Sequence, residues 1–477
     1  MKLEDFLQTN YGYNPEIKDN IKGYYSQWLS WYEGNVKSFH NYYTWNGRKK
    51  VWQTRLTMNM AKEISEDWSD ILWSEKCKIS MKDETAQKDF EDLNNDLKLN
   101  VLINQAIEKS GALGTAGTVV SVYDIVENEA GMYLDVSDAK TRVDLVDFEW
   151  IYPLTWNNKG ITECAFGSVE YVKGQKYVVL SVHKLADDGN YHIFNHLFRD
   201  TNGNLTEITE FEDTMKDFNT MSDKKWFSIW KPLLTNNLFN NSPFGIPHFA
   251  NAIDNMKAVD ISFDELKNEL VNGRKRTFVR ADMLNYDDGT QKMTFDKNDT
   301  TVYVLPAGAT KDDLIQSDTE NLRTDKQIET LNTNLNILGN KVGFGENHYH
   351  FDGTNLSTAT AVVSSNSKMF RRKKKLEIGY SDAIKDLVEA VCYASTQFGK
   401  YNINTDDMAI QFDDSIVEDK EAESNRALRE KSAGIMSAVE YRMKIFGETE
   451  EIAQQAIDKI NESNPSIEYL LGAGGAE

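Results

Sequence analysis

Two long stretches in the middle of the chain carry apolar residues at the spacing of an amphipathic helix. Apolar positions are separated by 3, 3, 4, 3 and 4 residues within 248–272, and by 3, 4, 3 and 4 within 318–342. This spacing places the apolar side chains on one helical face. At ~1.5 Å per residue, each helix would be about 35 Å long. The apolar positions are Ile253, Met256, Val259, Phe263, Leu266 and Leu270 in the first, and Ile328, Leu331, Leu335, Leu338 and Val342 in the second.

The ends of these helices and the segment between them also carry signals. Asn272-Gly273 would end the first helix as a C-cap, and Ser317 or Asp318 would cap the second. Between them, runs at 276–280, 292–295 and 301–305 are rich in β-branched and aromatic residues. The pattern therefore predicts a two-helix stalk that carries a small β unit. Such a stalk cannot bury both apolar faces by itself, so we expect neighbouring stalks to cover the remainder.

The rest of the chain mixes helices and strands. Residues 56–75 and 98–110 have helical apolar spacing, whereas residues 118–232 contain alternating, strand-like runs separated by turns. A polar loop bracketed by glycines follows the second stalk helix. A long helix is then predicted over 357–397, before an acidic helical tail. These elements together predict an α+β fold class.

Aromatic residues near the N-terminus admit two interpretations. Trp28, Trp31 and Tyr32 have helical spacing, which is typical of a packed core. A further group lies among basic residues, an arrangement that single-stranded nucleic acid can stack on. We favour core packing as the interpretation. The further group consists of Tyr42, Tyr43, Trp45 and Trp52, with Arg48, Lys49 and Lys50 between them.

Composition and charge narrow the function classes. The chain has 477 residues, 53 Lys+Arg and 75 Asp+Glu, and therefore a formal net charge of −22. That balance argues against a protein that holds nucleic acid by its phosphates, although not against one that touches DNA without holding it. With 40% hydrophobic and 27% charged residues, the chain is typical of a folded, soluble protein. No run of ~18 apolar residues occurs, so we expect no membrane span. Three widely spaced cysteines indicate a reducing compartment.

One cluster resembles a metal site. In His348-x-His350-x-Asp352, alternation would place two imidazoles and a carboxylate on one side of an extended loop. No fourth ligand or catalytic base lies at a useful spacing. We therefore favour a flexible polar loop and expect neither a metal nor a cofactor. No sequence motif for nucleophilic or phosphate-binding chemistry has its supporting context, so we expect no enzyme.

A run of five cations stands out in this acidic protein. Arg371, Arg372, Lys373, Lys374 and Lys375 point all round the predicted long helix, so they cannot form one flat face. One interpretation is a solvated stretch that neutralises acidic neighbours, including those on an adjacent subunit. The other is a brief contact with DNA phosphates.

Three sequence blocks, in the same order, resemble the portal proteins of tailed bacteriophages, most closely those of siphophages with Gram-positive hosts. The first block lies near the N-terminus, the second spans the start and end of the first stalk helix, and the third opens the long helix. The blocks are LTMNMAKEI (56–64) with ILWSE (71–75); SPFGIP (242–247) with AIDNMKAVD (252–260) and NGRKR (272–276); and TATAV (358–362) with SKMFRRKKK (367–375).

This resemblance implies a ring of twelve subunits at one capsid vertex, with an axial channel for packaging and ejecting double-stranded DNA. It also implies a channel loop whose DNA-facing residues would be Glu346, Asn347, His348, Tyr349 and His350. By resemblance the parts are the wing (1–246), a stem helix (247–273), the clip (274–317), a second stem helix (318–342), the channel loop (343–357), a long wing helix (358–404) and a short crown (405–477).

The resemblance also implies partners. The clip would dock the terminase large subunit and later a head-completion adaptor, and the ring would contact major capsid and scaffolding proteins. The protein would assemble in the host cytoplasm and reside in the virion, without a membrane. Two alternatives remain open: a metal-dependent hydrolase that uses His348, His350 and Asp352, and another virion structural protein such as an adaptor.

Overall fold

The computed structural model describes residues 1–45, 49–124, 139–209, 215–273, 322–345, 347–351, 359–398, 401–413 and 427–463. It also describes short strands between residues 126 and 135 and between 276 and 318. The chain divides into two compact units. Unit 1 contains residues 1–356 and 367–413, and unit 2 contains 357–366 and 414–477. Helices and strands are mixed throughout unit 1, which confirms an α+β protein.

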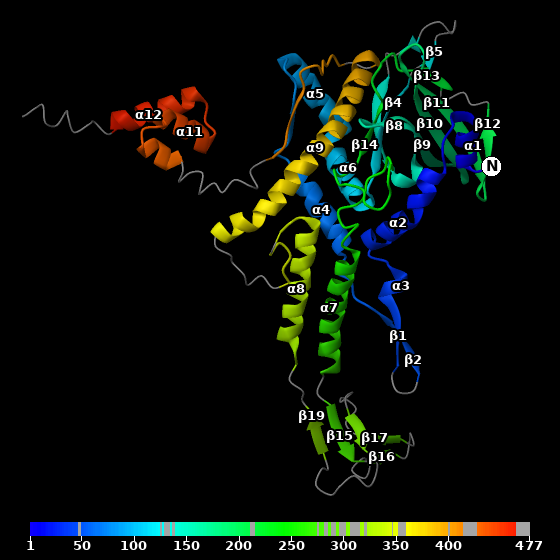
Figure 1. Ribbon diagram of the computed structural model, residues 1–477, viewed down its shortest axis with the longest axis vertical. Coiled ribbons are helices and arrows are strands. Elements are labelled where there is room, and N and C mark those ends of the chain that lie inside the picture. Colours follow the sequence, from blue (N-terminus) through cyan, green and yellow to red (C-terminus); the bar gives the residue numbers. More distant parts are fainter. Residues whose placement is uncertain are drawn as a thin grey trace, which may run out of the picture. The chain divides into compact units, whose positions relative to one another are not determined.

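Helices form the N-terminal part of unit 1 (Figure 1). The helix predicted over 56–75 is shorter, because it begins after Asn59 in the left-handed conformation and ends at Leu72. The helix predicted to end at Gly111 continues to Leu113, where Gly114 at φ +82° forms the cap. The helices are α1 (Leu3–Tyr11), α2 (Glu16–Tyr32), α3 (Lys37–His40), α4 (Met60–Leu72), α5 (Glu84–Leu97) and α6 (Leu99–Leu113).

Antiparallel sheets follow, as the alternating pattern predicted. The largest has the strand order β12-β11-β10-β9-β8, with β13 also paired to β11, and a second sheet has the order β14-β4-β7. The strands are β4 (Ala116–Tyr123), β5 (Val126–Glu127), β6 (Leu134–Asp135), β7 (Lys140–Asp147), β8 (Ile151–Asn157), β9 (Gly160–Val172), β10 (Gln175–Leu185), β11 (Tyr191–Thr201), β12 (Asn204–Ile208), β13 (Asp217–Asn219) and β14 (Phe227–Trp230).

The stalk consists of α7 (Ile253–Asn272) and α8 (Thr324–Val342), which lie side by side (Figure 1). They run antiparallel, since Asn334 of α8 bonds Ser262 Oγ at 2.7 Å while Arg323, just before α8, forms a bidentate pair with Glu269. Both helices start later than predicted. Ser317 and Asp318 do not cap α8, because they belong to strand β19, which pairs with β15.

The segment between the stalk helices is β structure, as predicted. Strand β15 is central, pairing with β18 in parallel and with β19 in antiparallel orientation, and β16 and β17 form a separate hairpin. The strands are β15 (Arg276–Arg280), β16 (Asn285–Asp287), β17 (Lys292–Thr294), β18 (Val302–Leu305) and β19 (Ile315–Asp318).

The long helix α9 spans Ala359–Phe398, as the sequence indicated. From Met369 onward most of its apolar side chains, such as Leu376, Leu387 and Val391, are buried in the main core of unit 1, whereas Ile378 is exposed. That core also receives α2, α4, α6 and the stalk ends. After α9, strand β20 (Ala409–Gln411) pairs with β3 (Lys78–Ser80), so residues up to 413 return to the N-terminal helices.

Smaller elements complete the chain. Strands β1 (Asn41–Trp45) and β2 (Lys50–Thr54) form a hairpin beside α7. In unit 2, the tail contains helices α11 (Ala438–Phe446) and α12 (Glu450–Ser463), and α11 begins with a capping box at Ser437. Among the helices of the described part, none is both long and apolar enough to cross a lipid bilayer.

Candidate functional site

The loop after α8 begins where only glycine fits easily. Gly343 has φ +105°, and its N–H closes α8 by donating to Gly339 O. A Cβ there would lie 3.0 Å from Arg372 Cγ and 3.3 Å from the Trp68 ring. The left-handed backbone and this close approach turn the chain from the stalk toward α4.

Four rings form a continuous stack at this turn. Phe344 lies against Trp68 with centroids 4.5 Å apart, and His348 covers the other face of Phe344 at 4.2 Å. His248 also contacts Trp68, with centroids 5.6 Å apart and the ring planes tilted by 33°. Trp68 also donates its Nε1–H to Val342 O, at the end of α8. The stack therefore ties the loop, the stalk and α4 together.

Polar contacts dock the same loop further. Tyr349 donates its hydroxyl to Asp67 Oδ2 at 2.8 Å, and His348 Nε2 lies 3.2 Å from the same oxygen. The pKa of Tyr349 is raised well above its usual range, first by burial and then by Asp67. The backbone amides of Asn347 and Phe351 donate to the side chains of Asn336 and Asn332 on α8. The flexible polar loop expected from the sequence is thus packed against α4 and α8 over its described residues 343–345 and 347–351.

The predicted metal ligands are only partly described. His348 faces Asp67, and His350 is half-buried with both ring nitrogens lacking a hydrogen-bond partner within the described chain. Asp352 and Glu346 lie outside the described residues. Within the ranges that the structure covers, no three His, Cys, Asp or Glu side chains gather as metal ligands would.

The basic run divides by burial. Arg371 and Lys375 are exposed, and Lys374 is half-buried and pairs with Glu377 at 3.2 Å. Lys373 is fully buried and donates to Glu377 Oε1 and to the carbonyl of Asp413. Hence Lys373 serves the interior of its own chain, and the expected contact with DNA or a neighbouring subunit does not hold for it.

Arg372 lies beside the turn at Gly343. It is half-buried beside Gly343, its Nε has no partner among the described atoms, and burial lowers the pKa of its guanidinium. Nearby His248 is completely buried, and burial together with Arg372 lowers its pKa to about 3. The imidazole is therefore neutral and serves as packing.

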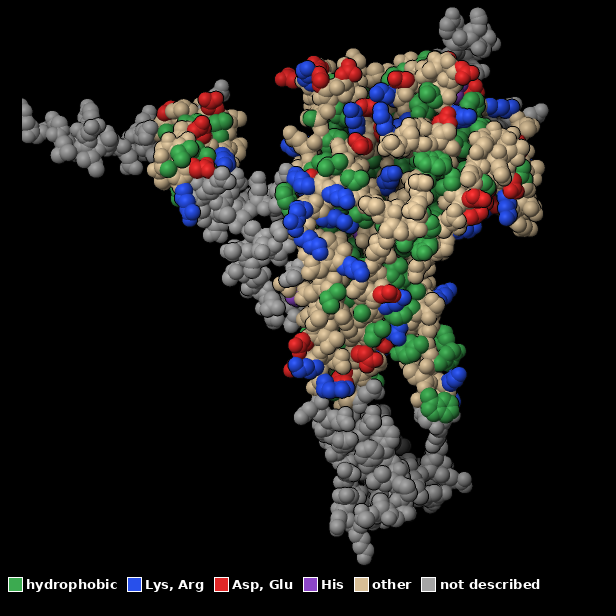
Figure 2. Space-filling view, viewed as in Figure 1, with side chains coloured by type: hydrophobic (Ala, Val, Ile, Leu, Met, Phe, Trp, Pro, Cys, Tyr) green, Lys and Arg blue, Asp and Glu red, His purple; other side chains and the backbone are tan. Residues whose placement is uncertain are grey.

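The exposed cations lie together on the surface. Figure 2 shows basic side chains gathered over the middle of α9, where Lys368, Arg371 and Lys375 are exposed. Lys368 also donates to the carbonyl of Asn340 at 2.6 Å. Another molecule can therefore reach Arg371 and Lys375 of the predicted run, and also the neighbouring Lys368.

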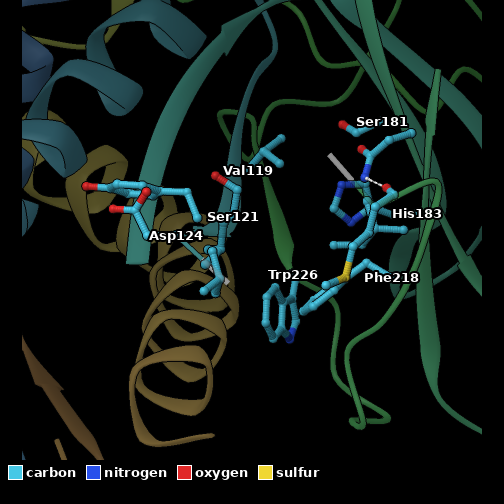
Figure 3. Close-up of a pocket in the computed structure, with 13 residues that line it drawn as sticks. Val119, Ser121, Asp124, Ser181, His183, Phe218 and Trp226 are labelled. Carbon is cyan, nitrogen blue, oxygen red and sulfur yellow. Dashed lines mark hydrogen bonds between the residues drawn. The ribbon is translucent and has the colours of Figure 1, made fainter. Parts of the chain in front are cut away.

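A cavity of about 320 Å³ lies elsewhere, between β4 and strands β10 and β11 (Figure 3). His183 on its wall is fully buried, with both ring nitrogens unpartnered in the described part, and burial lowers its pKa to about 3. The hydroxyl of Ser181 donates to Phe166 O at 3.5 Å and is not hydrogen-bonded to the imidazole of His183. A neutral histidine without a nucleophile or carboxylate bonded to it does not make an acid–base site.

Two functional contributors were not singled out from the sequence. Asp67 holds both Tyr349 and His348, yet it is one carboxylate among 75 acidic residues. Trp68 lies within the stretch 56–75 that has helical apolar spacing, but its partners Phe344 and Val342 are far away in sequence. Only a three-dimensional arrangement reveals that these residues anchor the loop.

Comparison with protein families yields a match along most of the chain. A family model described as phage portal protein, SPP1 Gp6-like, matches residues 13–466. The matched range includes the stalk, the docked loop and the basic run. None of the curated proteins matches the chain significantly.

Proposed function

Because the chain belongs to the phage portal protein family of SPP1 Gp6-like type, we propose that it forms a ring of twelve subunits at one capsid vertex. The ring would be the channel through which double-stranded DNA is packaged and later ejected. The family is structural rather than enzymatic, and its members are phage components. We further propose a siphophage of a Gram-positive host as the source, on the strength of the three sequence blocks.

The stalk carries the main support for a ring. Leu331, Leu335 and Leu338 of α8 are buried in the main core, but Ile261 of α7 and Ile337 of α8 are 43% and 48% exposed. A helix pair that leaves large apolar residues in water gains stability when identical pairs pack beside it. A closed ring supplies such neighbours to every subunit equally.

The net charge fits passage rather than retention of DNA. Twelve chains of −22 give a formal ring charge of 12 × −22 = −264. DNA carries one negative charge per ~1.7 Å, so a wall rich in cations would hold it. An acidic wall repels the duplex, and at physiological salt this acts only within ~8 Å.

Residues 343–357 are proposed as the channel loop. Tyr349 and one edge of His348 face Asp67, so they anchor the loop. Asn347, which is exposed, and the outer edge of His348 are then the described positions that can meet a passing duplex. Glu346 and His350 stay in the proposed set of DNA-facing residues.

Replacing residues 346–352 with a Gly/Ser linker tests the role of the loop. We expect rings to assemble while the DNA retained per particle falls, because the docked surface is lost but the stalk is intact. Wild-type DNA filling in particles that contain the replaced loop would remove the loop from the mechanism.

The partners follow from the same assignment. We propose that residues 274–317 form the clip, which docks the terminase large subunit and later the head-completion adaptor. The outer part, including residues 1–246 and 358–404, would be the wing that meets major capsid and scaffolding proteins. The tail after residue 413 would form the crown, and residues 405–413 join unit 1 through β20.

The proposed function requires no metal, so elemental analysis of purified protein should find no metal in stoichiometric amount. One metal ion per chain would instead favour a hydrolase.

A further inference from the structure

The β1–β2 hairpin has one face anchored to its own chain. Tyr42 donates its hydroxyl to Asp264 at 3.1 Å, and the amide of Leu56 donates to the same carboxylate. Asp260, one turn earlier on α7, accepts from Thr57, Met58 N–H and His40. Both carboxylates are buried. These bonds fix which face of the hairpin lies toward α7.

The opposite face is aromatic and open to solvent. The strand register pairs Tyr43 with Trp52 and Trp45 with Lys50, so these four side chains share one side. Tyr43 is 62% exposed, Trp45 66% and Trp52 53%, and the Tyr43 and Trp52 rings touch edge to face. Figure 2 shows hydrophobic side chains gathered on the hairpin beside the stalk. The core packing expected for the aromatic cluster is confirmed for Trp28 and Trp31 but is wrong for these three rings.

Such a face is unusual for a surface that stays in water. A two-stranded hairpin is marginally stable alone. Aromatic residues are enriched in the cores of protein interfaces, and each can bury ~150–250 Å². The three rings thus provide a compact, pre-positioned docking surface.

A matching surface exists on α7. Ile261 is 43% exposed, and Glu265, one turn further, is exposed on the same side. This stripe is separate from Asp260 and Asp264, which hold the hairpin, and from Ser262, which meets α8. Charges also match: Lys50 is exposed on the aromatic face of the hairpin, and Glu265 is exposed on the α7 stripe.

We propose that the aromatic face of the hairpin docks on the α7 stripe of a second copy of this chain. Tyr43, Trp45 and Trp52 would cover Ile261 of the neighbour, with Lys50 near its Glu265. The two surfaces differ, so the contact is heterologous, and repetition by rotation closes a ring. The inference rests on the proposed portal function, because only a ring places each hairpin beside the next stalk at the same height.

Truncation of the face tests its contribution to assembly. In the full chain, Tyr43→Ser/Trp45→Ser/Trp52→Ser should raise the concentration needed for rings by about 30-fold or more, as expected for residues central to an interface. Tyr171→Ser is the matched control, because Tyr171 on β9 is 71% exposed. Circular dichroism and the melting temperature report whether the variants fold.

Photo-crosslinking identifies the occupant. Benzoylphenylalanine at position 43 of otherwise wild-type rings should form adducts between two chains, mapped by mass spectrometry to α7. Adducts only within one chain, or interchain adducts mapped elsewhere, would overturn the proposal. A hairpin variant that assembles like wild type would also overturn the proposal. The same holds for a variant whose rings persist but which no longer binds a labelled single-stranded oligonucleotide. A wild-type chain that never forms rings would instead refute the portal function itself.

Discussion

The ring stack at the end of the stalk makes the sharpest prediction about the channel loop. Phe344 is 1% exposed and has Trp68 on one face and His348 on the other. Phe344→Ala removes both ring contacts and leaves a cavity beneath the loop. We therefore expect the loop to detach from α4 and α8 while the stalk itself persists.

The magnitude follows from the burial of the ring. Truncating a buried phenylalanine costs about 3–5 kcal/mol, and stacked aromatic pairs add ~0.5–1.5 kcal/mol beyond their buried area. If ~3 kcal/mol of this anchors the loop, local opening becomes roughly a hundredfold more frequent. Phe351→Ala is the matched control in the same loop, because Phe351 is 41% exposed and its truncation removes far less packing.

Hydrogen–deuterium exchange of the assembled protein measures this opening. The amide of Asn347 is bonded to Asn336 Oδ1, so its exchange reports detachment of the loop. We expect peptides covering 344–350 to lose about two orders of magnitude of protection in Phe344→Ala and little in Phe351→Ala. Equal protection in the two variants would show that the stack does not anchor the loop.

Three further predictions concern buried ionisable groups. Asp260→Asn should lower the melting temperature and expose the hairpin to proteolysis, at a cost of about 2–3 kcal/mol for lost charge-assisted bonds. Asp254→Asn should change neither, because this side chain is exposed in the first turn of α7. Lys373→Met should destabilise by about 3 kcal/mol, because it removes the fully buried cation that faces Glu377 and leaves the half-buried Lys374 to pair with this carboxylate. Lys375→Met should leave the melting temperature unchanged. Burial lowers the pKa of His183 from 6.5 to about 3, so the unfolded chain binds the extra proton. The free energy of unfolding should therefore fall as pH drops below 6.5, by up to ~1.4 kcal/mol per pH unit. Calorimetry of His183→Phe should show that its free energy of unfolding depends less steeply on pH. An unchanged dependence on pH would contradict this.

The stalk shows how much of the fold the local hydrophobic pattern predicts. Residues such as Met256, Val259, Leu331 and Leu335 are buried as their spacing predicted, because helical periodicity is a property of neighbouring residues. The predicted start of α8 was wrong because Asp318 belongs to a strand, in which it pairs with Arg276 of β15. Strand pairing over such a distance has no local signature.

The candidate site shows what the local sequence pattern could not predict. Five consecutive cations look equivalent in sequence, yet Lys373 is buried and Lys375 is exposed, since rotation of α9 about its axis depends on the whole core. The loop residue Tyr349 was singled out, but its partner Asp67 lies on a helix 282 positions earlier. Chemistry-bearing positions could be found from sequence, whereas their partners could not.

Native mass spectrometry of the purified full chain, with electron micrographs of the same sample, tests the central claim most directly. The account predicts a species of 12 × 54.5 kDa, about 650 kDa, that appears as a ring with twelvefold symmetry and an open axial channel. A stable 54.5 kDa monomer under every condition tried, with no ring in the phage particles, would contradict it.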